Sequence, residues 1–212
     1  MSRPTVVCLT PVKNEEWILE RFLAAASLWA DVIIVADQHS TDRSREIVSS
    51  FEKVQLIENP NPEFNEPERQ ALLITAARER VPGPRLLLAL DADEALSGNF
   101  TTSPEWERIL AAAPGTSIRL HWANVTPSGQ EYWSTGSLTE WGFVDDGTPH
   151  AGKTIHSPRV PVRAGGPVLD CAELHFLHLQ YIDPARTASK QRWYQCYERL
   201  RQPETSPVRL FD

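Results

Sequence analysis

The chain has 212 residues, of which 41% are hydrophobic and 23% are charged, enough for one large α/β domain with its own core. Its net charge of −7 argues against a nucleic-acid-binding protein, because phosphate backbones bind to basic surfaces. The three cysteines lack metal-binding spacing, and no apolar run is long enough to span a membrane. Residues 1–4 run directly into strand-like sequence, so we expect a cytoplasmic protein, and peripheral contact with a membrane stays open.

The first part of the chain alternates between strand-like and helix-like patterns. Apolar or β-branched runs predict strands at residues 5–10, 32–36, 54–57 and 86–90. Helices are expected between them at residues 17–26 and 43–51, and from residue 66 to just before Pro82. Asn14 is placed to cap the first of these helices. This β-α-β-α-β-α-β order is typical of a parallel sheet with helices on both faces.

Beyond residue 96 the pattern is less regular. We predict a short helix at residues 106–113 and a strand at residues 117–124. Residues 126–152 are rich in Gly, Ser, Thr, Asp and Trp, and we interpret them as a long functional loop or a substrate-facing subregion. The rest of the chain predicts strands at residues 153–162 and 168–178 and a helix at residues 187–200.

The most informative segment is the apolar run at residues 86–90, because it ends in Asp91, Asp93 and Glu94. Three carboxylates at the end of a buried strand are costly unless a cation meets them. In open α/β sheets the ligand crevice lies just beyond the carboxyl ends of the strands. The Asp-x-Asp therefore suggests a divalent ion shared with a phosphate-bearing ligand, and a solvated acidic turn is the alternative.

Polar clusters also follow the first and second predicted strands, and a parallel sheet would bring all three clusters to one crevice. These clusters can hydrogen-bond a base and a ribose. The sequence has no Gly-x-Gly-x-x-Gly and no P-loop, so phosphates would be neutralised by a metal ion, which argues against a dinucleotide dehydrogenase or a P-loop kinase. The two additional clusters contain Lys13, Asn14 and Glu15, and Asp37, Ser40 and Asp42.

Three ordered segments, PVKNEE at residues 11–16, DQHSTD at 37–42 and LDADE at 90–94, resemble the family-two glycosyltransferases with the GT-A fold. The resemblance covers about the first hundred residues. It implies a GT-A-like, mostly parallel Rossmann-type sheet flanked by helices, with a smaller acceptor-side β and loop region and a C-terminal helix. It also implies a nucleotide-diphosphate sugar donor, a divalent Mn²⁺ or Mg²⁺ ion and a saccharide or lipid-linked acceptor.

The resemblance implies roles for individual residues. Residues 1–100 would form the nucleotide-sugar-binding half, and residues 101–212 the acceptor-binding half, of one continuous domain. Gln38 stands where the family often has an acid. Arg69, near the start of a helix, is expected either to reach the diphosphate or to pair with Glu66. The expected metal ligands in this half are Asp91 and Asp93, and the expected nucleotide-binding residues are Pro11, Asn14, Glu15, Asp37, Ser40, Asp42, Arg69 and Asp91.

The C-terminal third is similar to a subgroup that extends lipopolysaccharide core saccharides. The similar residues are HLQY at 178–181, with Lys190 and Tyr194 beyond. In that subgroup the strand-end histidine, here His178, would complete the metal or diphosphate site, which suits Mn²⁺ because it accepts imidazole beside carboxylate. His175 could take this role instead.

The catalytic base is not fixed by the resemblance, because Ser157 stands where the subgroup has an acid. Inverting transfer needs a carboxylate to accept the proton of the acceptor hydroxyl. Asp146 is our first choice, with Asp145 and Glu140 as alternatives. Trp133 and Trp141 are expected to stack on the acceptor sugar.

The sequence thus predicts metal-dependent, inverting transfer of a sugar to a hydroxyl acceptor. One alternative is a nucleotidyltransferase that makes a nucleotide sugar, although such enzymes usually have a glycine-rich, basic first loop, and residues 11–15 have one lysine and no glycine. The other alternative is a catalytically silent homologue that binds nucleotide sugars, which the serine at position 157 keeps open.

Overall fold

The computed structural model describes residues 3–153 and 157–201. They form an eight-stranded mixed sheet flanked by helices, which confirms the predicted α/β class. The strands are β1 (Thr5–Val12), β2 (Val32–Asp37), β3 (Val54–Glu58), β4 (Arg85–Ala89), β5 (Glu94–Leu96), β6 (Ser117–Val125), β7 (Tyr132–Val144) and β8 (Val168–His178). The α-helices are α1 (Leu19–Ala26), α2 (Ser44–Ser49), α3 (Glu66–Arg80), α4 (Pro104–Leu110) and α5 (Pro184–Arg201), and short 3-10 helices lie at Gly98–Thr101 and Gln180–Ile182.

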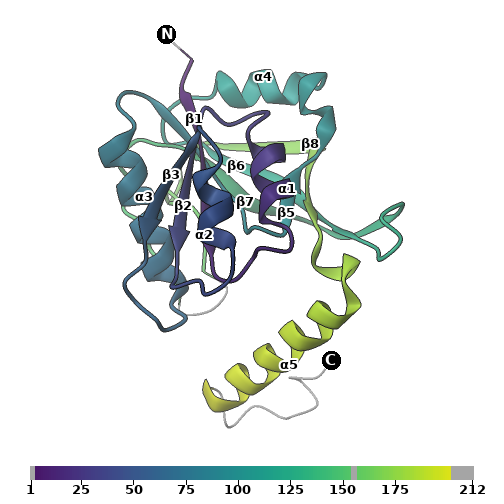
Figure 1. The fold of residues 1–212 in the computed structure, drawn as a ribbon. Helices are drawn as coiled ribbons and strands as arrows, with labels where there is room; N and C mark the ends of the chain where they lie inside the picture. The colour runs from purple at the N-terminus through teal and green to yellow at the C-terminus, as the bar shows by residue number, and fades with distance from the viewer. Residues whose placement is uncertain (1–2, 154–156, 202–212) are drawn as a thin grey trace.

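The strand order is β3-β2-β1-β4-β7-β6-β8-β5. The first four strands in this order are parallel and come from the β-α-β repeats that the sequence predicted. β7 is antiparallel to both β4 and β6, whereas β6 and β8 are parallel. The carboxyl ends of β1, β2 and β4 therefore lie at one edge of the sheet, the edge toward α5 in Figure 1.

The core is divided by the sheet into two layers, as alternation along β1 requires. Val6 and Cys8 pack into the layer that contains the apolar faces of α1, α2 and α4. Val7 and Leu9 point the opposite way, into the layer covered by α3. Because both faces of β1 are covered, its sequence is a nearly continuous apolar run.

Strand β7 corrects the prediction of a loop at residues 126–152. Its first half is exposed and belongs to a hairpin with β6 that projects from the body, whereas its last four residues are buried between β4 and β6. Gly142 lies in this buried half, where an added Cβ would come within 2.6 Å of Leu88 Cδ2 and 3.1 Å of Ile118 Cβ. Gly142 is part of the composition that suggested a loop, and its lack of a Cβ is what lets three strands pack closely here.

Other boundaries also differ from the predictions. No strand forms at residues 157–162, the described end of the strand predicted at residues 153–162, and residues 154–156 lie outside the described residues. Helix α1 begins at Leu19, after a turn, so Asn14 does not cap it. The acidic segment after β4 continues into the short strand β5, which pairs with β8 and which the sequence did not indicate.

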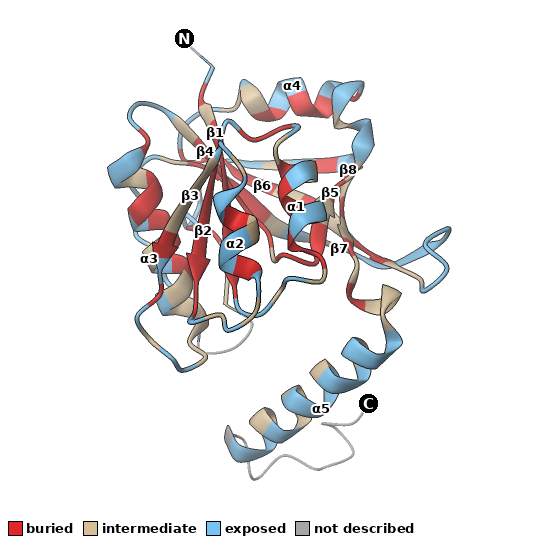
Figure 2. Ribbon diagram, in the orientation of Figure 1, coloured by how far each residue is buried: buried red, intermediate tan, exposed pale blue. Residues whose placement is uncertain are grey.

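Helix α5 differs from the other α-helices because none of its described side chains is buried (Figure 2). It lies below the sheet in Figure 1, at the edge where β1, β2 and β4 end. Nowhere in residues 3–153 and 157–201 is there a helix with the length and hydropathy needed to cross a membrane.

The buried carboxylate of Glu105, on α4, connects that helix to β8. It accepts three backbone hydrogen bonds of 2.7–3.0 Å from consecutive residues of β8. Burial raises the pKa of Glu105, but these N–H groups lower it more, so that the pKa lies below its ordinary value. The three donors are the backbone N–H groups of Ala172, Glu173 and Leu174.

We expect Glu105→Gln to lower the free energy of unfolding by about 1–3 kcal/mol at neutral pH, because a carboxamide offers one acceptor oxygen to three donors. The difference from wild type should shrink as the pH falls below the ordinary carboxyl pKa of 4.5, since a depressed folded-state pKa stabilises the protein only while the unfolded carboxyl is ionised. Urea denaturation measures both effects. Glu107→Gln, on the exposed face of α4, is the control, and equal stability of the two variants would contradict this role.

Candidate functional site

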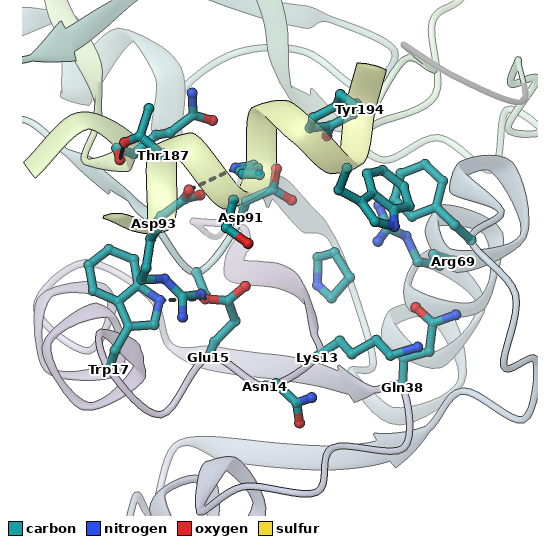
Figure 3. Close-up of a pocket in the computed structure, with 18 residues that line it drawn as sticks. Lys13, Asn14, Glu15, Trp17, Gln38, Arg69, Asp91, Asp93, Thr187 and Tyr194 are labelled. Carbon is teal, nitrogen blue, oxygen red and sulfur yellow. Dashed lines mark hydrogen bonds and ion pairs between the residues drawn. The ribbon is translucent and has the colours of Figure 1, made fainter. Parts of the chain in front are cut away.

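A cavity of about 560 Å³ lies at the carboxyl ends of β1, β2 and β4, and α5 forms its opposite wall (Figure 3). The loops after β1 and β4 therefore contribute to one site, as the sequence predicted. The C-terminal helix adds a wall that the strand pattern alone did not place there. Within the described residues, the charged side chains that line the cavity are Lys13, Glu15, Arg69, Asp91, Asp93, Arg186 and Lys190.

The loops after β1 and β2 are bound to each other. Asn14 has a φ of 57°, a left-handed conformation that asparagine tolerates better than most residues. Its backbone N–H donates to Ser40 Oγ at 3.0 Å, and its Oδ1 accepts from Thr41 N at 2.8 Å. Asp42 Oδ2 accepts from Glu16 N at 3.0 Å. Ser40 and Asp42, both expected to bind nucleotide, do not line the cavity and instead brace the Asn14 loop.

Asp37, at the end of β2, is buried behind the cavity wall. Its Oδ2 accepts from Arg45 Nη1 and from Ser40 N, both at 3.2 Å. Its Oδ1 is buried and has no hydrogen-bond partner in the described part of the chain. The neighbouring Gln38 does line the cavity, and its Nε2 donates to the backbone oxygens of Asn61 and Glu63. The end of β2 therefore positions the loop that follows β3.

Arg159 balances the negative charge of two of the three acids that follow β4. Its guanidinium donates to Asp91 Oδ2 at 2.9 Å and to both carboxylate oxygens of Glu94. The Glu94 side chain is fully buried, and burial raises its pKa against the effect of the Arg159 charge. The guanidinium also lies 4.4 Å from the centre of the Trp141 ring, a cation–π contact. Asp91 keeps one side toward the cavity.

Asp93, the second acid of the Asp-x-Asp, lies beside Asp91 in the cavity (Figure 3). Its Oδ2 accepts a hydrogen bond from Nζ of Lys190, on α5, at 3.0 Å. The same oxygen lies 3.6 Å from His178 Nε2. Burial raises the pKa of Asp93, but the contact with His178 and the Lys190 charge outweigh burial and hold the pKa well below its usual range. Asp93 is thus a nearly buried carboxylate that stays ionised.

His178 has the environment of a metal ligand. Its Nδ1 lies 2.9 Å from Asn124 Oδ1, on β6. With Asn124 in this orientation its carboxamide oxygen can only accept, so Nδ1 of His178 carries a proton and Nε2 is the ring nitrogen that faces Asp93. A hydrogen bond to the other ring nitrogen is the usual support of a metal-bound histidine. His175 instead stacks on His121, with ring centres 5.5 Å apart.

This donor set fits a divalent ion that completes its shell with ligand phosphates. The described residues contain no group of three or more His, Cys, Asp or Glu side chains arranged to hold a metal ion. Asp93 and His178 provide two donors, and Asp91 lies beside Asp93. Mg²⁺ sites typically have only one or two protein carboxylates, with water and substrate phosphate as the other ligands. The imidazole of His178 makes the same donor set suitable for Mn²⁺.

Glu15 connects the β1 loop to α5. Its Oε2 accepts from Trp17 Nε1 at 2.7 Å and from Arg186 Nη2 at 3.0 Å. Burial raises the pKa of Glu15, although both of these contacts lower it. Arg186 also lies over the Trp17 ring, 4.5 Å from its centre. Together with the Lys190–Asp93 pair, this contact holds α5 across the cavity through acids of the site itself.

Arg69 lines the cavity from the start of α3, as expected of a residue that could reach a diphosphate. Its guanidinium lies 4.7 Å from the centre of the Phe64 ring, which also contacts Trp193 on α5. The alternative pairing of Arg69 with Glu66 is not found among the described residues. Glu66 Oε2 instead accepts from Ser157 N at 2.7 Å. The Arg69 charge therefore faces the cavity.

Asp146 is wrong as the catalytic base. It lies just after β7 at the amino end of β4, where Asp145 N donates to Arg85 O, whereas the site lies beyond the carboxyl end of β4. Asp146 pairs with Arg163 at 3.1 Å, and the pKa of Asp146 is lowered by its hydrogen bonds with Thr148 and by this charge. The two alternative candidates for the catalytic base are also unsuitable. Asp145 is buried in ion pairs with Arg78 and Arg85, and Glu140 does not line the cavity.

The two tryptophans expected to bind acceptor lie in different environments. Trp141 is 2% exposed and lies against Arg159, so it offers no free face to a sugar, and this expectation is corrected. Its ring packs against Trp122 and Phe176. Trp133, on the projecting hairpin, is 48% exposed.

Sequence reasoning missed the site residues that come from distant parts of the chain. Arg159 follows the serine at position 157 and carried no recognisable signal except its charge. Arg186 was also missed, whereas Lys190 and Tyr194 were noted only through the resemblance. The three acids after β4 were a usable signal, because buried acids require nearby cations, and the cations that pair with them, Arg159 and Lys190, come from the last third of the chain.

No protein-family model and no curated protein matches the chain. Solved structures similar to it include glucosyl-3-phosphoglycerate synthase from Mycobacterium tuberculosis with Mn²⁺, UDP and glucosyl-3-phosphoglycerate, 18% identical over 57% of this chain and 44% of that chain, with a TM-score of 0.42. S. aureus TarS with UDP is 14% identical over 56% of this chain and 36% of that chain, with a TM-score of 0.45. A 4-diphosphocytidyl-2C-methyl-D-erythritol synthase is 14% identical over 67% of this chain and 74% of that chain, with a TM-score of 0.46. The chain thus spans less than half the length of the first two.

We expect Arg159→Met to lower the free energy of unfolding by about 3–5 kcal/mol, because it leaves Glu94 buried without its partner. Arg159→Lys should fall between wild type and Arg159→Met, since lysine keeps the charge but loses the paired donors and the contact with Trp141. The control is Arg163→Met, which removes a pair whose arginine is 56% exposed and should change stability by about 0.5 kcal/mol or less. Chemical denaturation measures all three, and a fully stable Arg159→Met would disprove the compensation.

Proposed function

We propose that the chain is a metal-dependent glycosyltransferase that moves a sugar from a nucleotide-diphosphate donor to a hydroxyl acceptor, with inversion at the anomeric carbon. The observation that carries the proposal is the pair Asp91 and Asp93 in one cavity with the β1 loop, with His178 next to Asp93. We place the reaction in the cytoplasm, with a saccharide or lipid-linked saccharide as the acceptor.

The donor would lie along the edge of the sheet, with its nucleoside on the loops after β1 and β2. There Pro11, Asn14 and Glu15 line the cavity, and Asp37 lies behind the wall. Asp91 would bind the ribose. The left-handed Asn14 and its hydrogen bonds to the β2 loop fix this wall before any ligand binds, which lowers the entropic cost of binding.

The diphosphate would lie near Asp93. Three cations, Arg69, Arg186 and Lys190, line this cavity from α3 and α5, and charge-assisted hydrogen bonds from such groups recognise phosphate. Asp93 and His178 would hold the metal ion, with Asp91 nearby. When bound, that ion neutralises negative charge that develops on the leaving diphosphate.

The nucleotidyltransferase alternative would use the same cavity for a different reaction. Against it stands the β1 loop, in which Lys13 is the single basic residue and no glycine amides are available to cradle a triphosphate. Incubation with a nucleoside triphosphate and a sugar phosphate, with detection of pyrophosphate, separates the two. Pyrophosphate release, with no sugar transfer, would replace our proposal with this alternative.

Asp93→Asn should abolish metal-dependent binding of the nucleotide sugar and lower transfer at least about a hundredfold, because it removes the charge that holds the metal ion. The donor is first selected from UDP, GDP, CDP and dTDP sugars by thermal shift with and without Mn²⁺, since bound ligand raises apparent stability. Calorimetry then compares Asp93→Asn with wild type.

The control is Asp170→Asn. Asp170 is an exposed acid near the start of β8, at the opposite end of that strand from His178, and it pairs with Arg119 on β6. Full metal-dependent binding by Asp93→Asn would contradict the proposed site. Binding that depends on Asp93, without hydrolysis or transfer of any donor, would instead favour the catalytically silent alternative.

Lys190→Met should tighten Mn²⁺ binding to the nucleotide-free protein about threefold to tenfold, because Asp93 loses a competing cation that lies 3.0 Å away. Electron paramagnetic resonance of free Mn²⁺ measures the change. Arg192→Met removes the same charge from an exposed position of α5 and should leave the affinity unchanged. Equal affinities in wild type and Lys190→Met would show that Lys190 does not compete for the metal site.

A further inference from the structure

A second cavity, of about 320 Å³, lies beside the first. It is formed by the turn end of the β6–β7 hairpin, the short helix after β8 and the start of α5. Thr187 lines both cavities, so they meet at this residue. The aromatic residues of the second cavity are Trp133 and Tyr181, whose ring centres lie 5.8 Å apart at an interplanar angle of 50°.

Strand register joins this cavity to the acidic site. Asn124 on β6 is the Cα partner of Trp133 on β7 and of His178 on β8. Directly paired residues point to the same face of a sheet, so Trp133 shares a face with His178. Tyr181 lies between them, with its ring centre 6.1 Å from that of His178. A row of rings thus leads from Asp93 to the second cavity.

The lining of this cavity limits what it can bind. None of its seven lining residues is charged. The Thr126 hydroxyl already donates to the backbone oxygen of Glu131, and the Thr187 hydroxyl donates to those of Gln180 and Asp183. Phosphate or carboxylate groups would therefore find no charged partner here, and the available surface consists of the Trp133 and Tyr181 rings with their N–H and O–H groups and of two prolines, Pro127 and Pro184.

The exposure of Trp133 indicates a ligand with one apolar face. The side chain is 48% exposed, so it forms an open platform and not an enclosed pocket. A wholly apolar group on this platform would leave much of its own surface in water, which costs free energy. A pyranose ring can lay its C–H face on an aromatic ring and keep its hydroxyls in solvent.

We infer that the second cavity binds a neutral pyranose ring of the acceptor, with Trp133 and Tyr181 as its stacking faces, and that the reacting hydroxyl points past Thr187 toward the donor cavity. The assignment of this ring to an acceptor rests on the proposed function. The inference excludes sugar phosphates and acidic sugars from this position and makes Trp133 a specificity-determining residue.

Saturation-transfer difference NMR tests the inference with methyl α- and β-glucopyranosides, galactopyranosides and mannopyranosides as probes. We expect saturable binding of at least one glycoside, with the strongest transfer to ring C–H protons. Trp133→Ala should weaken this binding at least about tenfold, and Trp133→Phe should retain part of it, because a smaller aromatic face remains. Glucose 6-phosphate and 1-hexanol are the charged and apolar probes.

Tyr132→Ala is the matched control, because Tyr132 is the neighbouring residue of the hairpin, is 60% exposed and contacts His175 instead of the cavity. It should bind the glycoside as wild type does. The inference is overturned if no glycoside binds, if binding does not depend on Trp133, or if 1-hexanol or glucose 6-phosphate is the probe that binds through Trp133. No nucleotide or metal is added, so failure of the donor site leaves this result unaffected.

Discussion

The site depends on charge compensation at the end of β4. β4 is apolar from its second residue onward and leads into Asp91, Asp93 and Glu94, and of these the Glu94 side chain is completely buried. Arg159 pairs with Glu94 and Asp91, whereas Lys190 and His178 face Asp93. Ionised carboxylates at such a position persist only with partners of opposite charge. The chain thus supplies an arginine to one side of the acidic turn and a lysine and a histidine to the other.

The same charges determine where α5 lies. This helix has no buried side chain among those described, so its position depends on ion pairs with Glu15 and Asp93 and on the aromatic contacts of Trp193 with Phe64. The wall of the cavity is consequently bound by the acids that a metal ion and a nucleotide would use. Under the proposed function, helix position and ligand binding would be coupled through these shared residues, and α5 also joins the two cavities through Thr187.

Sequence reasoning was most successful where the physical signal is local. Buried parallel strands read as apolar runs, so the first four parallel strands and the acidic turn were predicted. β7 was missed because half of it is an exposed ribbon and the other half needs Gly142 for close packing, and that error placed Asp146 near the site. Arg159 was missed because pairing across 65 or more positions leaves no trace in one sequence. Ser40 and Asp42 were expected to bind nucleotide, but the structure shows that they brace the Asn14 loop.

The most direct test of the central claim is a crystal structure with Mn²⁺ and the nucleoside diphosphate selected by binding, with data collected at the manganese absorption edge. The account predicts an anomalous peak bound by Asp93 and His178 Nε2, with Arg159 still paired to Glu94 and Lys190 no longer on Asp93. A manganese peak elsewhere, with Lys190 still paired to Asp93 and the nucleotide outside the cavity, would contradict it.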